Sequence, residues 1–156
     1  MNQKLLGEEH PHVATGLNNL AELYRVQEKY EKAEPLYLQA LEMDKKLLGE
    51  EHPHVATSLN NLALLYESQG KYEKAEPLYL QALEMNQKLL GKEHPSVAIG
   101  LNNLAKLYYF QERYSEAEPL YLKALAMAKK LLGKDHPHTQ TINSNLLDLQ
   151  EQIKSQ

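Results

Sequence analysis

The stretch from His10 to Glu51 decides the fold; it reads HPHVATGLNNLAELYRVQEKYEKAEPLYLQALEMDKKLLGEE. It returns with few changes from His52 to Glu93, and again, more altered, from His94 to Asp135, so the period is 42 residues. A period of this length is typical of solenoids, in which each unit buries its apolar face against its neighbours. Solenoids present long grooves to partners, and the repeat therefore favours recognition over catalysis as the function.

Each copy contains two runs with the periodicity of an amphipathic helix. In the first run, Leu17, Leu20, Ala21 and Tyr24 form one apolar stripe, and Pro11 suits the first turn of this helix. The second run carries its apolar residues from Ala33 to Leu48 and is expected to end at Gly49. Each copy is therefore predicted to be an antiparallel helical hairpin, and the fold class to be an all-α solenoid.

The period also predicts the organisation of the chain as one solenoid domain. Residues 10–51, 52–93 and 94–135 are expected to be three repeats, and residues 136–156 a C-terminal capping helix. The opening MNQKLLG is identical to residues 85–91, so residues 1–9 are expected to be the tail of a truncated preceding repeat. On this interpretation the chain is a fragment or an engineered piece of a longer parent protein.

The two apolar patterns also carry a family resemblance. The pattern Leu17-x2-Leu20-Ala21-x2-Tyr24, followed by Ala33-x3-Tyr37-x2-Ala40, resembles the tetratricopeptide repeat. The length of 42 residues, the HPxVA opening and the YEKAEPLYLQALE run are similar to the repeats of kinesin light chains and of many bacterial proteins. The resemblance covers the whole chain and implies a right-handed superhelix whose concave side is lined by the first helix of each repeat, with the second helix outside.

Composition narrows the classes of partner and compartment. The formal charge of −4 is spread along the chain without a basic block, which argues against nucleic-acid binding. Cysteine is absent, and the first residues contain no long apolar run, so no secretory signal and no transmembrane helix are predicted. These features predict a soluble, cytoplasmic protein without a membrane partner.

A helical wheel places one set of side chains opposite the core stripe of each first helix, where they are expected to line a peptide-binding groove. An Asn pair recurs in all three copies, whereas the other positions vary. Asparagine amides can both donate to and accept from a peptide backbone, so constant Asn residues suit binding that does not depend on ligand sequence. The alternative is that one Asn of each pair ties the neighbouring hairpin. The predicted groove residues are Thr15, Asn18, Asn19, Glu22, Arg25, Asn60, Asn61, Leu64, Glu67, Asn102, Asn103, Lys106, Tyr109 and Phe110.

Tyr109 and Phe110 place two adjacent aromatic rings on a face that is otherwise polar. Exposed aromatic side chains are common binding anchors, and with Lys106 they could hold an aromatic or acidic-aromatic side chain. The alternative is that both rings pack on the capping helix, where Leu146 and Leu149 are available. The sequence favours neither interpretation.

Catalytic and metal chemistry find little support. The motif His-Pro-His occurs at His10, His52 and His136, but two ligands beside a proline do not make a metal site, and a role at a helix start is favoured. No catalytic triad, phosphate-binding loop or converging carboxylate pair is visible. We therefore predict a protein that is not an enzyme and that has no cofactor and no metal.

The leading functional hypothesis is a protein–protein interaction scaffold that binds an extended peptide or a partner helix in the groove. The alternative is a structural module that self-associates end to end. In that case the apolar residues of the uncapped N-terminal edge, from Met1 to Leu6, would seek a neighbour. The identity of the partner is not predicted.

Overall fold

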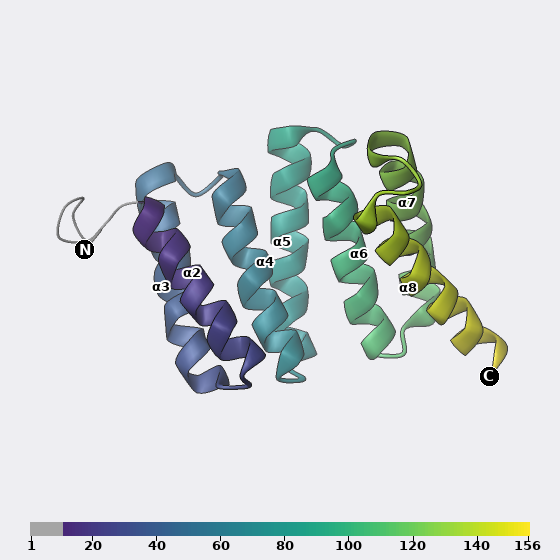
Figure 1. The fold of residues 1–156 in the computed structure, drawn as a ribbon, viewed down its shortest axis with the longest axis horizontal. Coiled ribbons are helices and arrows are strands. Elements are labelled where there is room, and N and C mark those ends of the chain that lie inside the picture. The colour runs from purple at the N-terminus through teal and green to yellow at the C-terminus, as the bar shows by residue number, and fades with distance from the viewer. Residues whose placement is uncertain (1–10) are drawn as a thin grey trace. The chain divides into compact units, whose positions relative to one another are not determined.

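The computed structural model describes residues 11–156, which form seven α-helices and no β-strand (Figure 1). The helices are α2 (Pro11–Val26), α3 (Tyr30–Leu48), α4 (Pro53–Ser68), α5 (Tyr72–Leu90), α6 (Pro95–Phe110), α7 (Tyr114–Leu132) and α8 (Pro137–Lys154). The prediction of an all-α fold built from helical hairpins is confirmed. The predicted tail of a preceding repeat, residues 1–9, lies outside the described residues.

The chain divides into two compact units, Met1–Met85 and Asn86–Gln156, and the division falls within α5. In the first unit α2 packs on α3, and α4 packs on both of them. In the second unit α6 packs on α7, and α8 packs on both of these helices. None of the described helices is long and apolar enough to cross a membrane.

A histidine caps the start of three of the helices. The imidazole Nδ1 of His52 accepts a hydrogen bond of 3.0 Å from the backbone N–H of His54, and His94 and His136 make the same bond to the residue two positions ahead. The following proline has no N–H to leave unsatisfied, which suits the first turn of a helix. The capping bond gives the recurring His-Pro pair a structural role at the helix start.

The turn inside each hairpin needs one residue in the left-handed region. Gly70 fills this place in the second copy with φ of 74°, but the first and third copies use Glu28 and Glu112 with φ of 61° and 58°. A side chain at positive φ costs energy that glycine avoids. The second hairpin therefore has the least strained turn of the three.

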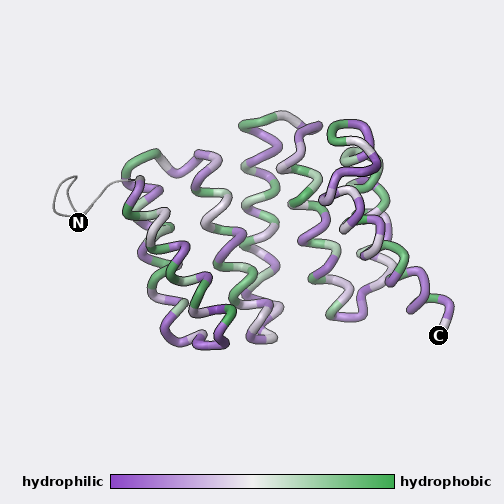
Figure 2. The backbone as a smooth tube through the Cα atoms, in the orientation of Figure 1, coloured by the Kyte–Doolittle hydropathy of each residue, from purple (hydrophilic) through white to green (hydrophobic). Residues whose placement is uncertain are grey.

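Small residues line the contact between the two helices of a hairpin. Ala21 of α2 and Ala33 and Ala40 of α3 are fully buried, and the ring of Tyr37 is buried with them. Alanine lets helix axes approach closely, and the aromatic ring fills the space beside the contact. Figure 2 shows apolar and polar residues alternating along each helix, as this one-sided burial requires.

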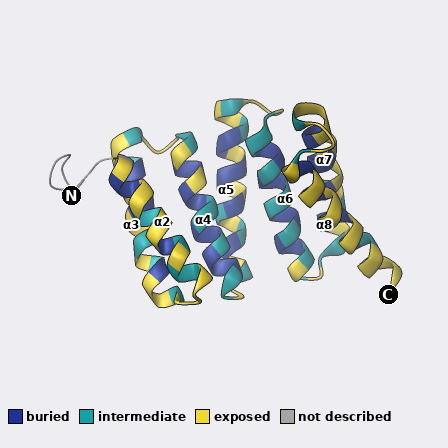
Figure 3. Ribbon diagram, viewed as in Figure 1, coloured by how far each residue is buried: buried dark blue, intermediate teal, exposed yellow. Residues whose placement is uncertain are grey.

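Helix α2 is less buried than α4, the equivalent helix of the second copy. Leu20 and Leu23 of α2 are exposed, whereas Leu62 and Leu65 occupy the same positions in α4 and are buried. Leu20 was predicted to lie in the core stripe, and for this copy the prediction is wrong. The physical reason is position, because α4 packs on the hairpin that precedes it and no described helix precedes α2. Figure 3 shows the exposed stretches on α2.

The last helix has one buried face and one exposed face. Ile142, Leu146 and Leu149 of α8 are buried, whereas Leu147 is exposed. Gln150 donates a hydrogen bond of 3.4 Å to Glu118 of α7, and in the first unit the hydroxyl of Tyr66 donates to Glu34 in the same way. The amide of Gln150 thus replaces the hydroxyl that the repeats use to join a hairpin to the next helix.

Candidate functional site

A polar pocket of about 320 Å³ opens in the first unit. Three helices contribute to it: α2, α3 and α4. The lining residues are Thr15, Asn18, Asn19, Asp44, His54, Thr57 and Asn61. Four of the predicted groove residues, Thr15, Asn18, Asn19 and Asn61, thus line one pocket.

Asp44 is a buried carboxylate that the sequence analysis did not place in the groove. It belongs to α3, only 4% of its surface is exposed, and it accepts a hydrogen bond of 2.8 Å from the hydroxyl of Ser58. The signal was available in the spacing, because Asp44 follows Tyr37 and Ala40 at the i+7 and i+4 positions of the buried helix face. A buried carboxylate that also lines a pocket is a strong acceptor for a ligand's hydrogen-bond donors.

The first Asn of the first pair and of the third pair bonds toward the neighbouring hairpin, whereas the Oδ1 of Asn60 in the second pair is buried without a hydrogen-bond partner among the described residues. The amide of Asn18 donates to the hydroxyl of Ser58 over 3.3 Å. In the second unit the amide of Asn145 in α8 donates to the carbonyl oxygen of Asn102 over 3.1 Å. For Asn18 and Asn102, these bonds favour the alternative in which the first Asn of the pair is a tie. Asn61, a second-position Asn, is half-buried, and Asn19 is exposed, so their amides remain available in the pocket.

Some predicted groove residues make contacts within the protein. Arg25 forms an ion pair of 2.6 Å with Glu22 and donates to the hydroxyl of Ser68 over 3.2 Å, and the hydroxyl of Tyr37 donates to Glu22 over 2.8 Å. In the second copy Glu67 is buried and accepts from the hydroxyl of Tyr79 over 3.3 Å. Asn60 and Leu64 are half-buried. Glu22, Arg25 and Glu67 therefore support the packing of the hairpins.

The ion pair of the first copy makes a testable electrostatic prediction. The hydrogen bond from Arg25 holds the pKa of the Glu22 carboxyl below its ordinary value, against the opposing effect of burial. A depressed pKa in the folded state stabilises the protein above the ordinary pKa, and the effect is lost as the pH falls through the folded value. Arg25→Gln should raise the pKa of Glu22, which an NMR titration of its carboxyl carbon measures directly. An unchanged midpoint would show that the guanidinium is not the cause.

The second unit carries the predicted aromatic pair. The rings of Tyr109 and Phe110 meet edge to face at 5.9 Å, and Tyr114 of α7 lies 5.8 Å from the Tyr109 ring. The ammonium of Lys106 lies 5.9 Å from the Phe110 ring. Phe110 keeps 44% of its surface exposed, so a large part of this ring is open to a ligand. Asn103 is half-buried on the same helix.

Potential metal ligands do not converge in the described part of the chain. No group of three or more His, Cys, Asp or Glu side chains within residues 11–156 is placed to hold a metal ion. The histidines of the His-Pro motifs that the structure describes use Nδ1 in helix caps. His10 lies outside the described residues.

The hairpins define the class of α-helical repeat proteins. The chain belongs to the tetratricopeptide repeat family, whose model matches residues 1–46, 12–88, 55–130 and 96–155. No curated protein matches the chain.

Solved structures of similar proteins agree with this family. BtubC (BKLC) from P. vanneervenii shares 32% identity with a TM-score of 0.80 over 91% of this chain, which spans 57% of that protein's length. The nearly identical TPR-like repeats of a protein from Podosopora anserina that is named as a kinesin light chain share 28% identity with this chain, with a TM-score of 0.81. The match covers 90% of this chain and 67% of that protein. The Sgt2 TPR domain from Aspergillus fumigatus, at 20% identity and a TM-score of 0.62, covers 90% of this chain and 79% of that domain and shows the fold alone.

The predicted family is therefore confirmed, including its likeness to kinesin light chain repeats. Tetratricopeptide repeats are scaffolds for protein–protein interaction and are generally not enzymes.

Proposed function

We propose that the chain binds an extended peptide through the predicted groove residues on the first helices of its repeats. The observation that carries the proposal is the pocket of the first unit, where four groove residues predicted from the sequence meet the carboxylate of Asp44. The amides of Asn19 and Asn61 offer donors and acceptors to a peptide backbone. The pocket would thus recognise a peptide partly through its backbone N–H and C=O groups, which every peptide has.

We expect Asp44 to give the pocket a preference for basic ligand side chains. Its carboxylate is the one acidic group among the lining residues, and the pocket contains no Lys or Arg. A ligand side chain with several N–H donors and a positive charge, such as Lys or Arg, would form a charge-assisted hydrogen bond there. In the second unit, Lys106 with the rings of Tyr109 and Phe110 would take a different side chain, aromatic or acidic.

The proposal is tested with a displayed library of random peptides panned on the full chain, followed by calorimetry of a selected peptide. Asn19→Ala combined with Asn61→Ala should weaken binding roughly 30-fold, because two lost hydrogen bonds of about 1 kcal/mol each amount to about 2 kcal/mol. The melting temperature should stay nearly constant, since neither amide has a hydrogen bond that joins the hairpins in the described structure. The matched control is Gln39→Ala, which also removes a side-chain amide, but from the exposed face of α3 outside the pocket. It should leave binding unchanged.

Two results distinguish the parts of the proposal. Panning that selects no peptide would contradict peptide binding itself. Selected peptides without enriched Lys or Arg, or an enrichment that survives Asp44→Asn, would contradict the role of Asp44 alone. Asparagine is the residue of the second copy at this position, Asn86, and it keeps the acceptor for Ser58.

The alternative of end-to-end self-association was predicted for Met1 to Leu6, which lie outside the described residues. A cytoplasmic location also stays a prediction.

A further inference from the structure

The second unit contains a hollow that is lined mainly by the second helices of the repeats, α5 and α7. Its volume is about 530 Å³, and it is formed by the end of α5, the connection from α5 to α6, and α7. The lining residues are Gln87, Lys92, Glu93, Lys123, Ala126, Met127 and Lys130. None of them belongs to the predicted groove, so the hollow is independent of the function proposed above.

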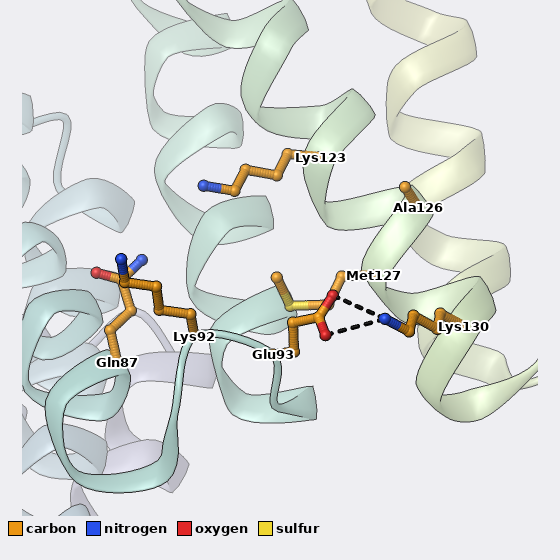
Figure 4. Close-up of a pocket in the computed structure, with 7 residues that line it drawn as sticks. All are labelled: Gln87, Lys92, Glu93, Lys123, Ala126, Met127 and Lys130. Carbon is orange, nitrogen blue, oxygen red and sulfur yellow. Dashed lines mark hydrogen bonds and ion pairs between the residues drawn. The ribbon is translucent and has the colours of Figure 1, made fainter.

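The charges of this hollow are not balanced. Glu93 accepts two hydrogen bonds from the ammonium of Lys130, at 2.9 and 3.0 Å, which neutralises that lysine. Lys92 and Lys123 have no acidic partner among the described residues. Figure 4 shows them reaching into the hollow from the α5–α6 connection and from α7, with their ammonium groups apart from the Glu93–Lys130 pair. Two uncompensated positive charges thus share one hollow on a chain whose formal net charge is −4.

The other copies of the repeat show that the charges of this hollow come from changes at the end of the second repeat and in the third repeat. Gln39 and Gln81 stand where the third copy has Lys123, and Glu42 and Glu84 stand where it has Ala126. Lys92 likewise replaces Glu50 of the first copy. Each replacement either adds a positive charge or removes a negative one. Met127 keeps the buried position of Met43 and Met85, so the charge of this surface changes while this core residue does not.

The floor of the hollow is apolar. Met127 is buried, and Ala126 presents only a methyl group where the first two copies have a glutamate. A ligand with carboxylates on short aliphatic stems matches both features, because the methylene groups contact Met127 and Ala126 while the carboxylates meet the ammonium groups. Lysine ammonium groups act as separate point charges, so each can pair with its own carboxylate on a flexible ligand.

We propose that this hollow binds an acidic segment of a partner protein, through at least two Glu or Asp side chains that pair with Lys92 and Lys123. A nucleic acid needs a larger basic patch than two lysines on a chain whose formal net charge is −4, whereas two carboxylates of one segment need only these two lysines. The proposed site lies outside the groove, so one chain can hold two different segments.

The test uses a fluorescent peptide of six glutamates and the full chain, with binding followed by anisotropy at low salt. Lys123→Gln combined with Ala126→Glu restores the residues of the first two copies, so the fold should tolerate both changes. We expect binding to weaken about tenfold, and Lys92→Glu alone to weaken it by a similar factor. The peptide should also dissociate as salt is raised, because exposed charges are screened.

The control is Lys71→Glu in the first unit, an exposed lysine whose replacement changes the net charge as much as the double variant does. It should leave binding within about twofold of the parent. Equal weakening by this control would show that only the net charge matters and would overturn the proposal, as would the absence of any binding by the parent chain. Displacement of the peptide by inorganic phosphate at an equal concentration would overturn the assignment to carboxylates. Asn19→Ala with Asn61→Ala should not affect the glutamate peptide, which separates this site from the groove.

Discussion

Leu65→Ala should lower the free energy of unfolding by about 2–5 kcal/mol, the range for removing a large aliphatic side chain from a packed core. Leu65 has no exposed surface, whereas Leu23, at the same place in the first copy, has 52% of its surface exposed. Leu23→Ala should therefore change the free energy of unfolding by no more than about 0.5 kcal/mol. Urea unfolding followed by circular dichroism measures both values.

The comparison is well controlled because the sequence around the two leucines is nearly the same: NNLAELYR in the first copy and NNLALLYE in the second. Helix propensity and local hydrogen bonding therefore cannot explain a difference between the two variants. If Leu23→Ala were as destabilising as Leu65→Ala, the side chain of Leu23 would have to be covered in solution. A second copy of the chain would then be the first occupant to test, by light scattering over a range of concentrations.

The same pair of leucines shows what periodicity can and cannot predict. The recurrence of Leu, Ala and Tyr at helical spacing predicted the hairpins, and Gly49 ends α3 as expected. Periodicity assigns the same environment to every copy, however, and so it could not predict that Leu20 and Leu23 would be exposed while Leu62 and Leu65 are buried. Burial depends on which hairpin lies alongside, and that information is not contained in a single repeat.

Only the part of the candidate site that lies on the first helices could be predicted from the sequence. The wheel placed Asn18, Asn19 and Asn61 on the surface that lines the pocket, because these residues and the core stripe belong to the same helix. It could not distinguish Asn18, which bonds to Ser58, from Asn19, which bonds to no neighbouring hairpin in the described structure. Asp44 was missed because it reaches the pocket from a different helix, and only the packing of α3 against α2 and α4 brings it there.

Ser58→Ile should destabilise the chain by about 3 kcal/mol or more. The buried carboxylate of Asp44 would lose the hydroxyl that donates to it over 2.8 Å, and a larger side chain would enter a packed site. The contact between the third copy and α8 already has an apolar pair in these places, since Ala128 and Ile142 occupy the positions of Asp44 and Ser58, and both are buried. Asp44→Ala combined with Ser58→Ile should therefore recover most of the lost stability, to within about 1 kcal/mol of the parent.

A double-mutant cycle by urea unfolding measures the coupling between the two positions. Additive losses would mean that Asp44 and Ser58 are not energetically linked and that the bond contributes little. Strong coupling has a consequence for function, because the double variant would be folded but would lack the carboxylate of the pocket. If its affinity for Lys- or Arg-containing peptides falls while its stability is restored, the buried Asp44 serves binding, since the apolar pair between the third copy and α8 would satisfy packing equally well.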